Sequence, residues 1–312
     1  MKLQFIKFIK KPIKFFFLLL IILSVKINAQ NNDDKDEDET KIYKKSKILT
    51  GFYIGSYFAN KYSASTYDGY GFDVNGNQNS FLNSFMYQKI KNVYGGGLGQ
   101  FDQIAGALGV DQGQWEFNES DMPINMRYVP AIMLGFNFKI PVSKNSAFIF
   151  NLNGSKLSIE GNFTMTLLKV LGSNPAINSN IKTFAIKGTE KRLLFQLGYQ
   201  KIFGTDDNIN FFGEIGFNGT LSQYNSNTIY INELQIDLTY YLNQNNNPIT
   251  SPTKPPTGFG LGAFAGLGLN IDLNSQFTMQ LLYSPSHEKI NIGNKPTLKL
   301  QNSIGVRLYY KI

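Results

Sequence analysis

The residues from Phe259 to Leu273 alternate strictly between two kinds of position. Every second residue, beginning with Phe259, is apolar, and the residues between them are mostly glycine, asparagine or aspartate. Such period-two alternation predicts a β-strand, and it runs longer than a typical strand of a soluble protein. One apolar face and one glycine-rich or polar face are typical of a strand that separates lipid from a narrow lumen. We therefore expect this chain to cross a membrane with strands.

The N-terminus predicts export. Lysines dominate the first fourteen residues, the apolar run Phe15–Leu23 follows, and a small residue stands at a suitable cleavage point, Ala29. This is the pattern of a secretory signal peptide, and its apolar run is too short for a membrane-spanning helix. Residues 1–29 are therefore expected to be removed. Residues 30–46 begin with a polar, acid-rich stretch and are expected to form a disordered periplasmic tail.

Charge and composition exclude several classes of function. The formal net charge is +8, but residues 1–29 hold six lysines and no acid, so the remaining chain has 24 basic and 22 acidic residues. A balance so close to neutral gives no reason to expect a nucleic acid partner. The chain has no cysteine and one histidine. It therefore cannot form disulfides and is a poor candidate for a transition-metal centre, and no cofactor is expected.

Eight segments of the chain alternate in this way, and one of them changes phase. In the third segment the apolar parity switches around Gly154, which predicts a bulge or bend there. The expected strands lie near residues 48–59, 127–140, 147–163, 192–203, 209–221, 259–273, 277–284 and 298–311.

Short and long connections alternate between the expected strands. The short ones, 141–145, 204–208 and 274–276, are rich in turn-forming residues and suit hairpins. The long ones are 60–126, 164–190, 222–258 and 285–297. Together with aromatic residues at both ends of the apolar faces, this pattern predicts an all-β fold: an up-and-down antiparallel transmembrane β-barrel of about eight strands over residues 47–312.

With its signal peptide, its eight alternating segments and the closing sequence from Gly305 to Ile312, the chain resembles the small outer-membrane β-barrels of Gram-negative bacteria, broadly the OmpA/OmpX-like and PorT-like families. The resemblance covers residues 47–312 as a pattern and brings no catalytic motif. It implies that the chain resides in the lipid of the cell outer membrane. It also implies insertion by the barrel-assembly machinery, because the closing segment is similar to that machinery's recognition signal.

The first long loop, residues 60–126, predicts a helical extracellular segment. Apolar residues follow helical spacing from Phe81 to Val93 and again from Phe101 to Leu108. We expect these helices to form a cap that buries its own apolar stripe. The alternatives are a plug in the barrel and a surface for an extracellular or envelope protein partner. The candidate aromatic anchors for such a partner are Phe81, Phe85, Trp115 and Phe117.

Five charged residues share the parity expected to face the lumen. A narrow lumen would force these charges to pair, so we expect structural salt bridges first and an ion path second. The candidate luminal charges are Arg127, Lys139, Glu214, Asp272 and Arg307.

A catalytic site finds little support in the sequence. The one histidine, His287, has Ser284, Ser286 and Glu288 nearby, but a serine and a histidine three residues apart in a strand face opposite ways. We therefore expect a non-enzymatic protein with a surface-binding, structural or narrow transport role. The alternatives are an outer-membrane lipid-modifying enzyme centred on His287 and an accessory barrel of a secretion machine.

Overall fold

The computed structural model describes residues 48–72, 77–91, 99–168, 180–204, 208–239, 257–292 and 298–311. The predicted signal peptide and acidic tail lie outside these residues. Side chains of residues 99–102 are likewise not described.

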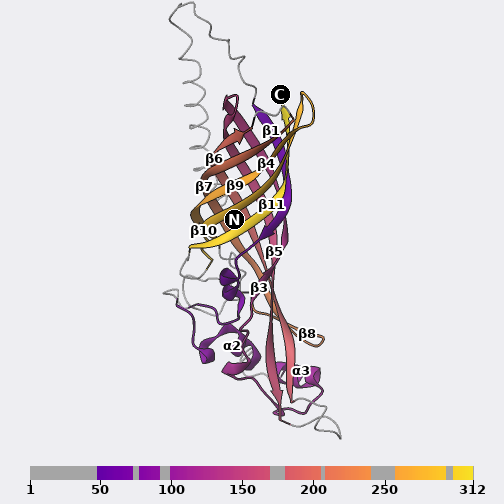
Figure 1. Ribbon diagram of the computed structural model, residues 1–312. Coiled ribbons are helices and arrows are strands. Elements are labelled where there is room, and N and C mark those ends of the chain that lie inside the picture. The colour runs from indigo at the N-terminus through magenta and orange to yellow at the C-terminus, as the bar shows by residue number, and fades with distance from the viewer. Residues whose placement is uncertain are drawn as a thin grey trace, which may run out of the picture. The chain divides into compact units, whose positions relative to one another are not determined.

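Eight antiparallel strands form a closed ring (Figure 1). Each strand pairs with the next one around the ring, and the last pairs with the first, so the ring has no free edge. The ring strands are β1 (Leu49–Phe58), β4 (Ala131–Ser143), β5 (Ser146–Leu167), β6 (Ile181–Phe203), β7 (Ile209–Ile231), β9 (Thr257–Asp272), β10 (Phe277–Lys289) and β11 (Leu298–Lys311). The predicted up-and-down barrel of eight strands is confirmed.

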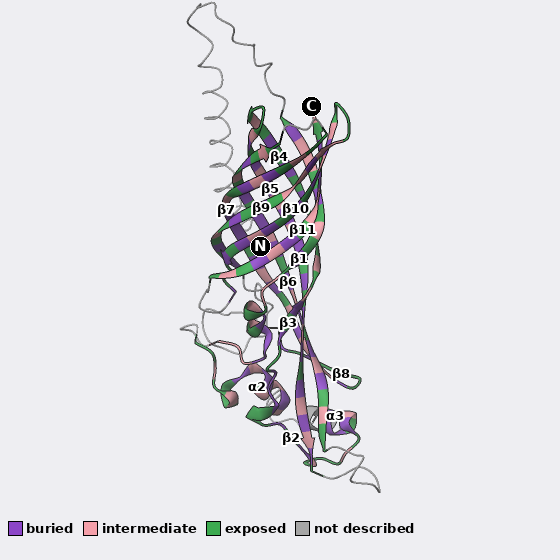
Figure 2. Ribbon diagram, in the orientation of Figure 1, coloured by how far each residue is buried: buried purple, intermediate pink, exposed green. Residues whose placement is uncertain are grey.

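The outside of the ring is apolar. Exposed and buried residues alternate along the barrel strands (Figure 2), and the exposed ones include Phe217 at 78% and Leu267 at 69%. An apolar outer face on a closed sheet is what a bilayer requires, since lipid offers no hydrogen bonds to a free strand edge. The chain is therefore a transmembrane barrel of the outer-membrane type. By the general rule for such barrels, we place its short turns on the periplasmic side and its long loops outside.

Three strands continue well beyond the barrel wall. β5, β6 and β7 are 22 or 23 residues long, so residues 181–190 and 222–231, predicted as loop, are strand. In this extension the inward positions are apolar: Leu157, Ile159 and Phe163 are almost fully buried. The prediction of a bulge at Gly154 is wrong, because neither neighbour of β5 shows a register shift there. The odd-numbered residues of β5 face inward along the whole strand. In the barrel they face the lumen, and in the extension they face the core formed with loop one.

The outer face changes character at the same level. Along β6 and β7 the outward residues Leu193 and Leu221 are paired, and the next outward pair is Lys191 with Gln223. On β5, Lys156 lies opposite Lys191. This row marks the extracellular edge of the apolar belt, and the strands beyond it are surrounded by water.

The remaining elements pack against the inner face of the extension. Loop one contributes two helices near the predicted places. Their buried residues Met86, Ile90 and Ile104 belong to the same hydrophobic core as Trp115. None of the helices within the described ranges is long and apolar enough to cross a bilayer. These elements are η1 (Lys61–Tyr67), η2 (Phe81–Asn83), α2 (Phe85–Lys91), α3 (Gly99–Leu108), β2 (Trp115–Glu116), η3 (Glu119–Asp121), β3 (Arg127–Val129) and β8 (Leu234–Asp237).

We call the described residues of 60–129, 156–191 and 223–239 the extracellular module. Its sheet is widened at both edges, because β2 and β3 pair with β5, and β8 pairs with β7. The labels α2, α3 and β8 lie at the end of the barrel opposite the C-terminus in Figure 1. The module therefore buries apolar side chains outside the membrane, in a hydrophobic cluster that continues into the barrel lumen.

The position of the belt predicts where an added charge is tolerated. Ala265→Arg places a charge on the outer face of β9 in the middle of the belt and should cost roughly 2–4 kcal/mol. Ser158→Arg places the same side chain on the outer face of the extension and should change stability by only about 0.5 kcal/mol. The yield of the folded, heat-modifiable band after refolding into bilayers measures both. Equal losses would mean that the belt edge is misplaced.

Candidate functional site

The periplasmic half of the lumen is closed by a buried ion pair. Arg307 on β11 donates two hydrogen bonds to Glu214 on β7, at 2.7 and 2.9 Å, and Gln200 on β6 donates a third at 3.1 Å. Both charged side chains are almost fully shielded from water. The bidentate arginine offsets the loss of hydration of the buried carboxylate. This layer joins three strands across the barrel interior.

A second charged layer lies at the extracellular end of the lumen. Arg192 lies 2.5 Å from Glu190 and also donates to the hydroxyls of Tyr57 and Tyr128, at 3.0 and 3.1 Å. Tyr128 in turn donates to Glu190 at 2.6 Å. These side chains come from β1, β3 and β6, so the layer crosses the mouth from three sides. We call it the mouth layer.

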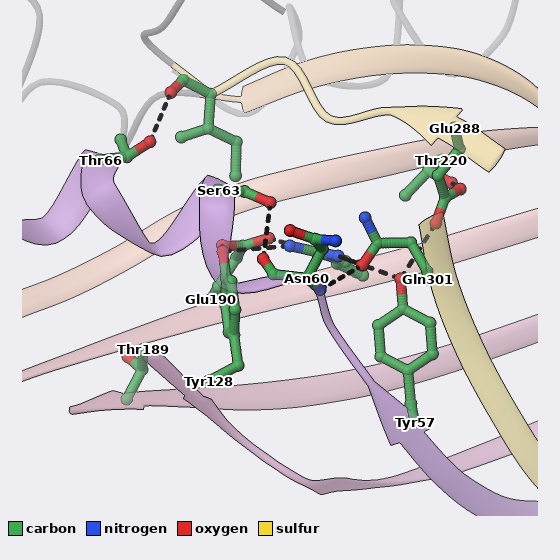
Figure 3. Close-up of polar contacts among 12 residues, drawn as sticks. Tyr57, Asn60, Ser63, Thr66, Tyr128, Thr189, Glu190, Thr220, Glu288 and Gln301 are labelled. Carbon is green, nitrogen blue, oxygen red and sulfur yellow. Dashed lines mark hydrogen bonds and ion pairs between the residues drawn. The ribbon is translucent and has the colours of Figure 1, made fainter. Parts of the chain in front are cut away.

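Glu288 on β10 extends the mouth layer. Its carboxylate accepts a hydrogen bond from the Tyr57 hydroxyl at 3.0 Å and further ones from Asn218 and Thr220. Figure 3 shows the Tyr57 hydroxyl pointing toward Glu288, with the Gln301 side chain beside it. Within the described part of the chain no cation lies at ion-pair distance from Glu288, so hydroxyl and amide donors alone compensate its burial.

Loop one covers the mouth layer from above. Tyr67 of η1 stacks on Tyr224 of β7 with ring centroids 4.6 Å apart, and its hydroxyl lies 3.4 Å from Glu190. The backbone N–H of Asn60, just before η1, donates a 2.7 Å hydrogen bond to the side-chain oxygen of Gln301. The start of loop one is therefore attached to the barrel rim rather than projecting away from it.

The end of β10 closes the mouth from the other side. Ile290 and Ile292 are buried, and the Thr66 hydroxyl of η1 donates to the Ile292 carbonyl at 3.4 Å. The backbone of residues 289–291, at the end of β10, crosses the inner face of β9 at two of its glycines. A Cβ at Gly258 or Gly260 would lie 1.3 or 1.4 Å from a backbone oxygen. Glycine in this part of β9 thus allows the strand to be crossed.

The structure brings together only part of the predicted luminal set. Lys139, Glu214 and Arg307 are buried inside the barrel, and Asp272 lies partly exposed, 3.9 Å from Lys311. Arg127 is a correction: its side chain is exposed, and its neighbour Tyr128 faces inward.

Proline explains this correction. The sequence predicted one continuous strand over 127–140. Pro130 instead separates β3 from β4, and the residues that face inward have even numbers in β3 and odd numbers in β4. The sequence prediction also missed Glu190 and Arg192 as a pair, because residue 190 was placed in a loop. Their even numbering continues the inward parity of Leu194, Gln196 and Gln200, which was the available signal.

The candidate aromatic anchors lie in the module core. Trp115 and Phe117 are each 2% exposed, and Phe81, which is partly buried, packs at 5.8 Å from Phe117 between ring centroids. Phe85 is also only partly exposed. These rings stabilise the cap that the sequence predicted, and their contact with a partner stays a prediction.

His287 lies on the outer face of β10. Its exposed side chain is flanked by Ser286 and Glu288, both of which face inward and are buried, as is Ser284. The strand therefore separates the histidine from the serines and the carboxylate that a catalytic pair would need.

Comparisons with known proteins find similar solved structures only. The chain is similar to the attachment invasion locus protein Ail of Yersinia pestis, at 8% identity and a TM-score of 0.32, over 86% of this chain and 99% of that one. It is similar to OprG of Pseudomonas aeruginosa, at 9% identity and a TM-score of 0.36, over 86% of this chain and 97% of that one. It is also similar to the outer membrane protein AlkL, at 9% identity and a TM-score of 0.24, over 90% of this chain and 98% of that one. No protein-family model matches, and no curated protein matches by sequence.

The mouth layer predicts a specific pattern of destabilisation. Arg192→Ala leaves Glu190 buried without its cation and should cost about 3–5 kcal/mol. The double change Arg192→Met with Glu190→Gln removes both charges and should recover much of that loss. The temperature at which the heat-modifiable band disappears measures each variant. A double variant as unstable as the single one would show that the pair does not act as a unit.

Asp68, directly after η1, is a buried carboxyl of the module. It is 7% exposed and accepts hydrogen bonds from the Tyr70 backbone and the Gln78 side chain, both at 2.9 Å. Burial raises the pKa of its carboxyl from 3.8 to about 7, and the two hydrogen bonds only partly oppose this.

The module should therefore become more stable as the pH falls. The folded state binds the Asp68 proton more tightly, so the gain is complete below the ordinary pKa and is lost as the pH rises through about 7. The effect is at most about 1.4 kcal/mol per pH unit. Fluorescence of Trp115, the only tryptophan, reports denaturant unfolding of the module. Asp68→Asn should remove the dependence, and an unchanged slope would refute the assignment.

Proposed function

We propose that this chain is a non-enzymatic outer-membrane barrel that anchors a surface-binding module. One observation carries the proposal: loop one and the β5–β7 extension share a hydrophobic core outside the membrane. An ordinary long loop has no such core, since flexible connections seldom bury apolar side chains. Three wall strands continue directly into this core, so the barrel holds the module in a fixed orientation.

The closed lumen supports anchoring over transport. The two charged layers cross the interior, and an eight-stranded barrel has room for little more than its own side chains. Moving a solute would require the Arg307–Glu214 pair and the mouth layer to separate, which would expose buried charges without partners. Narrow transport remains the second candidate, because the luminal side chains that would line a path are polar.

The outer surface of the module offers polar groups to a partner. Outward residues of the extension carry hydroxyl, amide and amino groups, and Lys187 lies 5.5 Å above the ring centre of Tyr230. Ile124 is 85% exposed and Leu82 60%, both in loop one. A surface of polar groups with a few apolar ones resembles a typical non-obligate protein interface. We therefore favour an extracellular or envelope protein as the partner, including the component of a secretion machine.

A lipid-modifying enzyme is the least favoured alternative. His287 faces the lipid side of β10, and its sequence neighbours with catalytic potential face the lumen. No other histidine exists in the chain. A hydrolytic or acyl-transfer mechanism would have to recruit its nucleophile from a different strand.

Removing the module tests the proposal. Residues 60–129, 156–191 and 223–239 are each replaced with a short Gly/Ser linker, because deleting loop one alone would expose Leu157, Ile159 and Phe163 to water. The trimmed barrel should fold, since the eight wall strands supply their own hydrogen bonds. Proteins cross-linked to the native chain in intact envelopes should be lost. Planar-bilayer conductance should stay at the wild-type level, because the Arg307–Glu214 layer remains.

Two outcomes would overturn the proposal. If the trimmed barrel conducts ions and the intact chain does not, the module is a plug, and transport becomes the favoured function. If the trimmed barrel retains a lipid-modifying activity that His287→Ala abolishes, the enzyme hypothesis is correct instead. His287→Ala in the intact chain is the matched control, because its exposed side chain makes no contribution to the core.

A further inference from the structure

Two lysines lie directly opposite each other at the extracellular edge of the belt. Lys156 on β5 and Lys191 on β6 are cross-strand partners, and both side chains are exposed on the outer face. Directly below Lys191 on the same face is Leu193, the last apolar residue of the belt on β6. The pair therefore lies where the hydrocarbon ends and the lipid headgroups begin.

The surroundings of this pair are basic. The row four residues further from the membrane holds Arg127, Glu160 and Lys187 side by side across β3, β5 and β6. Ser158 and Thr189 lie between the two rows and carry no charge. On this described part of the outer face, four cations thus accompany one carboxylate.

Like charges directly opposite each other in a sheet repel and destabilise it. Neither Lys156 nor Lys191 has a carboxylate of the described chain at ion-pair distance. The single acid, Glu160, lies between Arg127 and Lys187 in the upper row, so it is not available to the lower row. No carboxylate of the described chain therefore neutralises the lysine pair, and a bound anion would relieve its repulsion.

We propose that Lys156 and Lys191 bind the phosphate of an anionic lipid headgroup in the outer leaflet, with Arg127 and Lys187 as a second row. A sheet rises about 3.3 Å per residue, so the two rows are roughly 13 Å apart. The lower row meets a phosphate next to the acyl chains, and the upper row reaches headgroup substituents further out. This inference goes beyond the proposed function and depends only on the membrane placement of the barrel.

Lipid binding to the folded, detergent-solubilised chain tests this site. Native mass spectrometry measures the affinity for phosphatidic acid, with phosphatidylcholine as the zwitterionic reference of zero net charge. Near an anionic surface each basic side chain contributes roughly a fivefold gain in affinity. Lys156→Gln with Lys191→Gln should therefore lower the affinity for phosphatidic acid at least tenfold and leave that for phosphatidylcholine unchanged.

The matched control is Lys144→Gln with Lys201→Gln, an exposed lysine pair at the periplasmic turns. It removes the same charge and should leave the affinity within about twofold of wild type. Both variants must keep the heat-modifiable band, which shows that the barrel is folded. Equal losses in the two variants would mean that only net charge matters, and the site would be refuted. Full competition by inorganic phosphate would also overturn it, because the ligand would then be a soluble anion.

Discussion

The structure depends on one requirement: inside a bilayer every backbone N–H and C=O must find a partner within the protein. Pairing of β1 with β11 meets it, because it joins the first and last strands of the wall and leaves no edge. Closure then divides all wall residues into an outer and an inner set. Leucine, isoleucine and phenylalanine dominate the first, and the second combines amides, hydroxyls and paired charges with some buried apolar side chains, such as Phe212 and Leu282.

The same three strands pass through two solvents. Within the bilayer, β5, β6 and β7 face lipid with apolar side chains and the lumen with mostly polar ones, apart from Ile149, Leu194 and Phe212. Beyond the row of Lys156, Lys191 and Gln223 the distribution is reversed, since water is now outside and the helices of loop one are inside. The pairing of β5 with β6 continues through this level without a shift, whereas the pairing of β6 with β7 shifts register between Thr189 and Glu190. The barrel and the module are in this sense two folded layers built on one continuous sheet.

The lumen and the module are joined by the mouth layer. Tyr57 and Arg192 belong to the wall, whereas Tyr67 comes from loop one and Tyr128 from the short strand that follows it. Tyr67, Tyr128 and Arg192 are hydrogen-bonded to Glu190, and Tyr57 is hydrogen-bonded to Arg192. Buried hydrogen-bonded charges allow few alternative arrangements, because each displaced group would lose its compensation. Fixed orientation of the module is the physical consequence, and it is what a binding surface on a membrane anchor requires.

The sequence by itself determined the wall of this protein. Period-two alternation in segments such as Phe259–Leu273, together with short turns and a predicted export signal, was sufficient to predict the strand order, the lipid-facing side and the inward direction of Glu214 and Arg307. These are local properties, since a residue's parity within one strand is enough to assign its face. Which of the luminal charges pair with each other was not predicted.

Only the tertiary structure decided the rest. Pro130 moves Arg127 outward and Tyr128 inward, and the burial of Trp115 and Phe117 depends on strands more than forty positions away in the sequence. Leu157 and Ile159 appeared out of phase because the sequence does not show which partner an inward face will meet. An alternating pattern specifies two faces of a strand, and the packing of distant segments decides which of them is covered by lipid, by water or by protein.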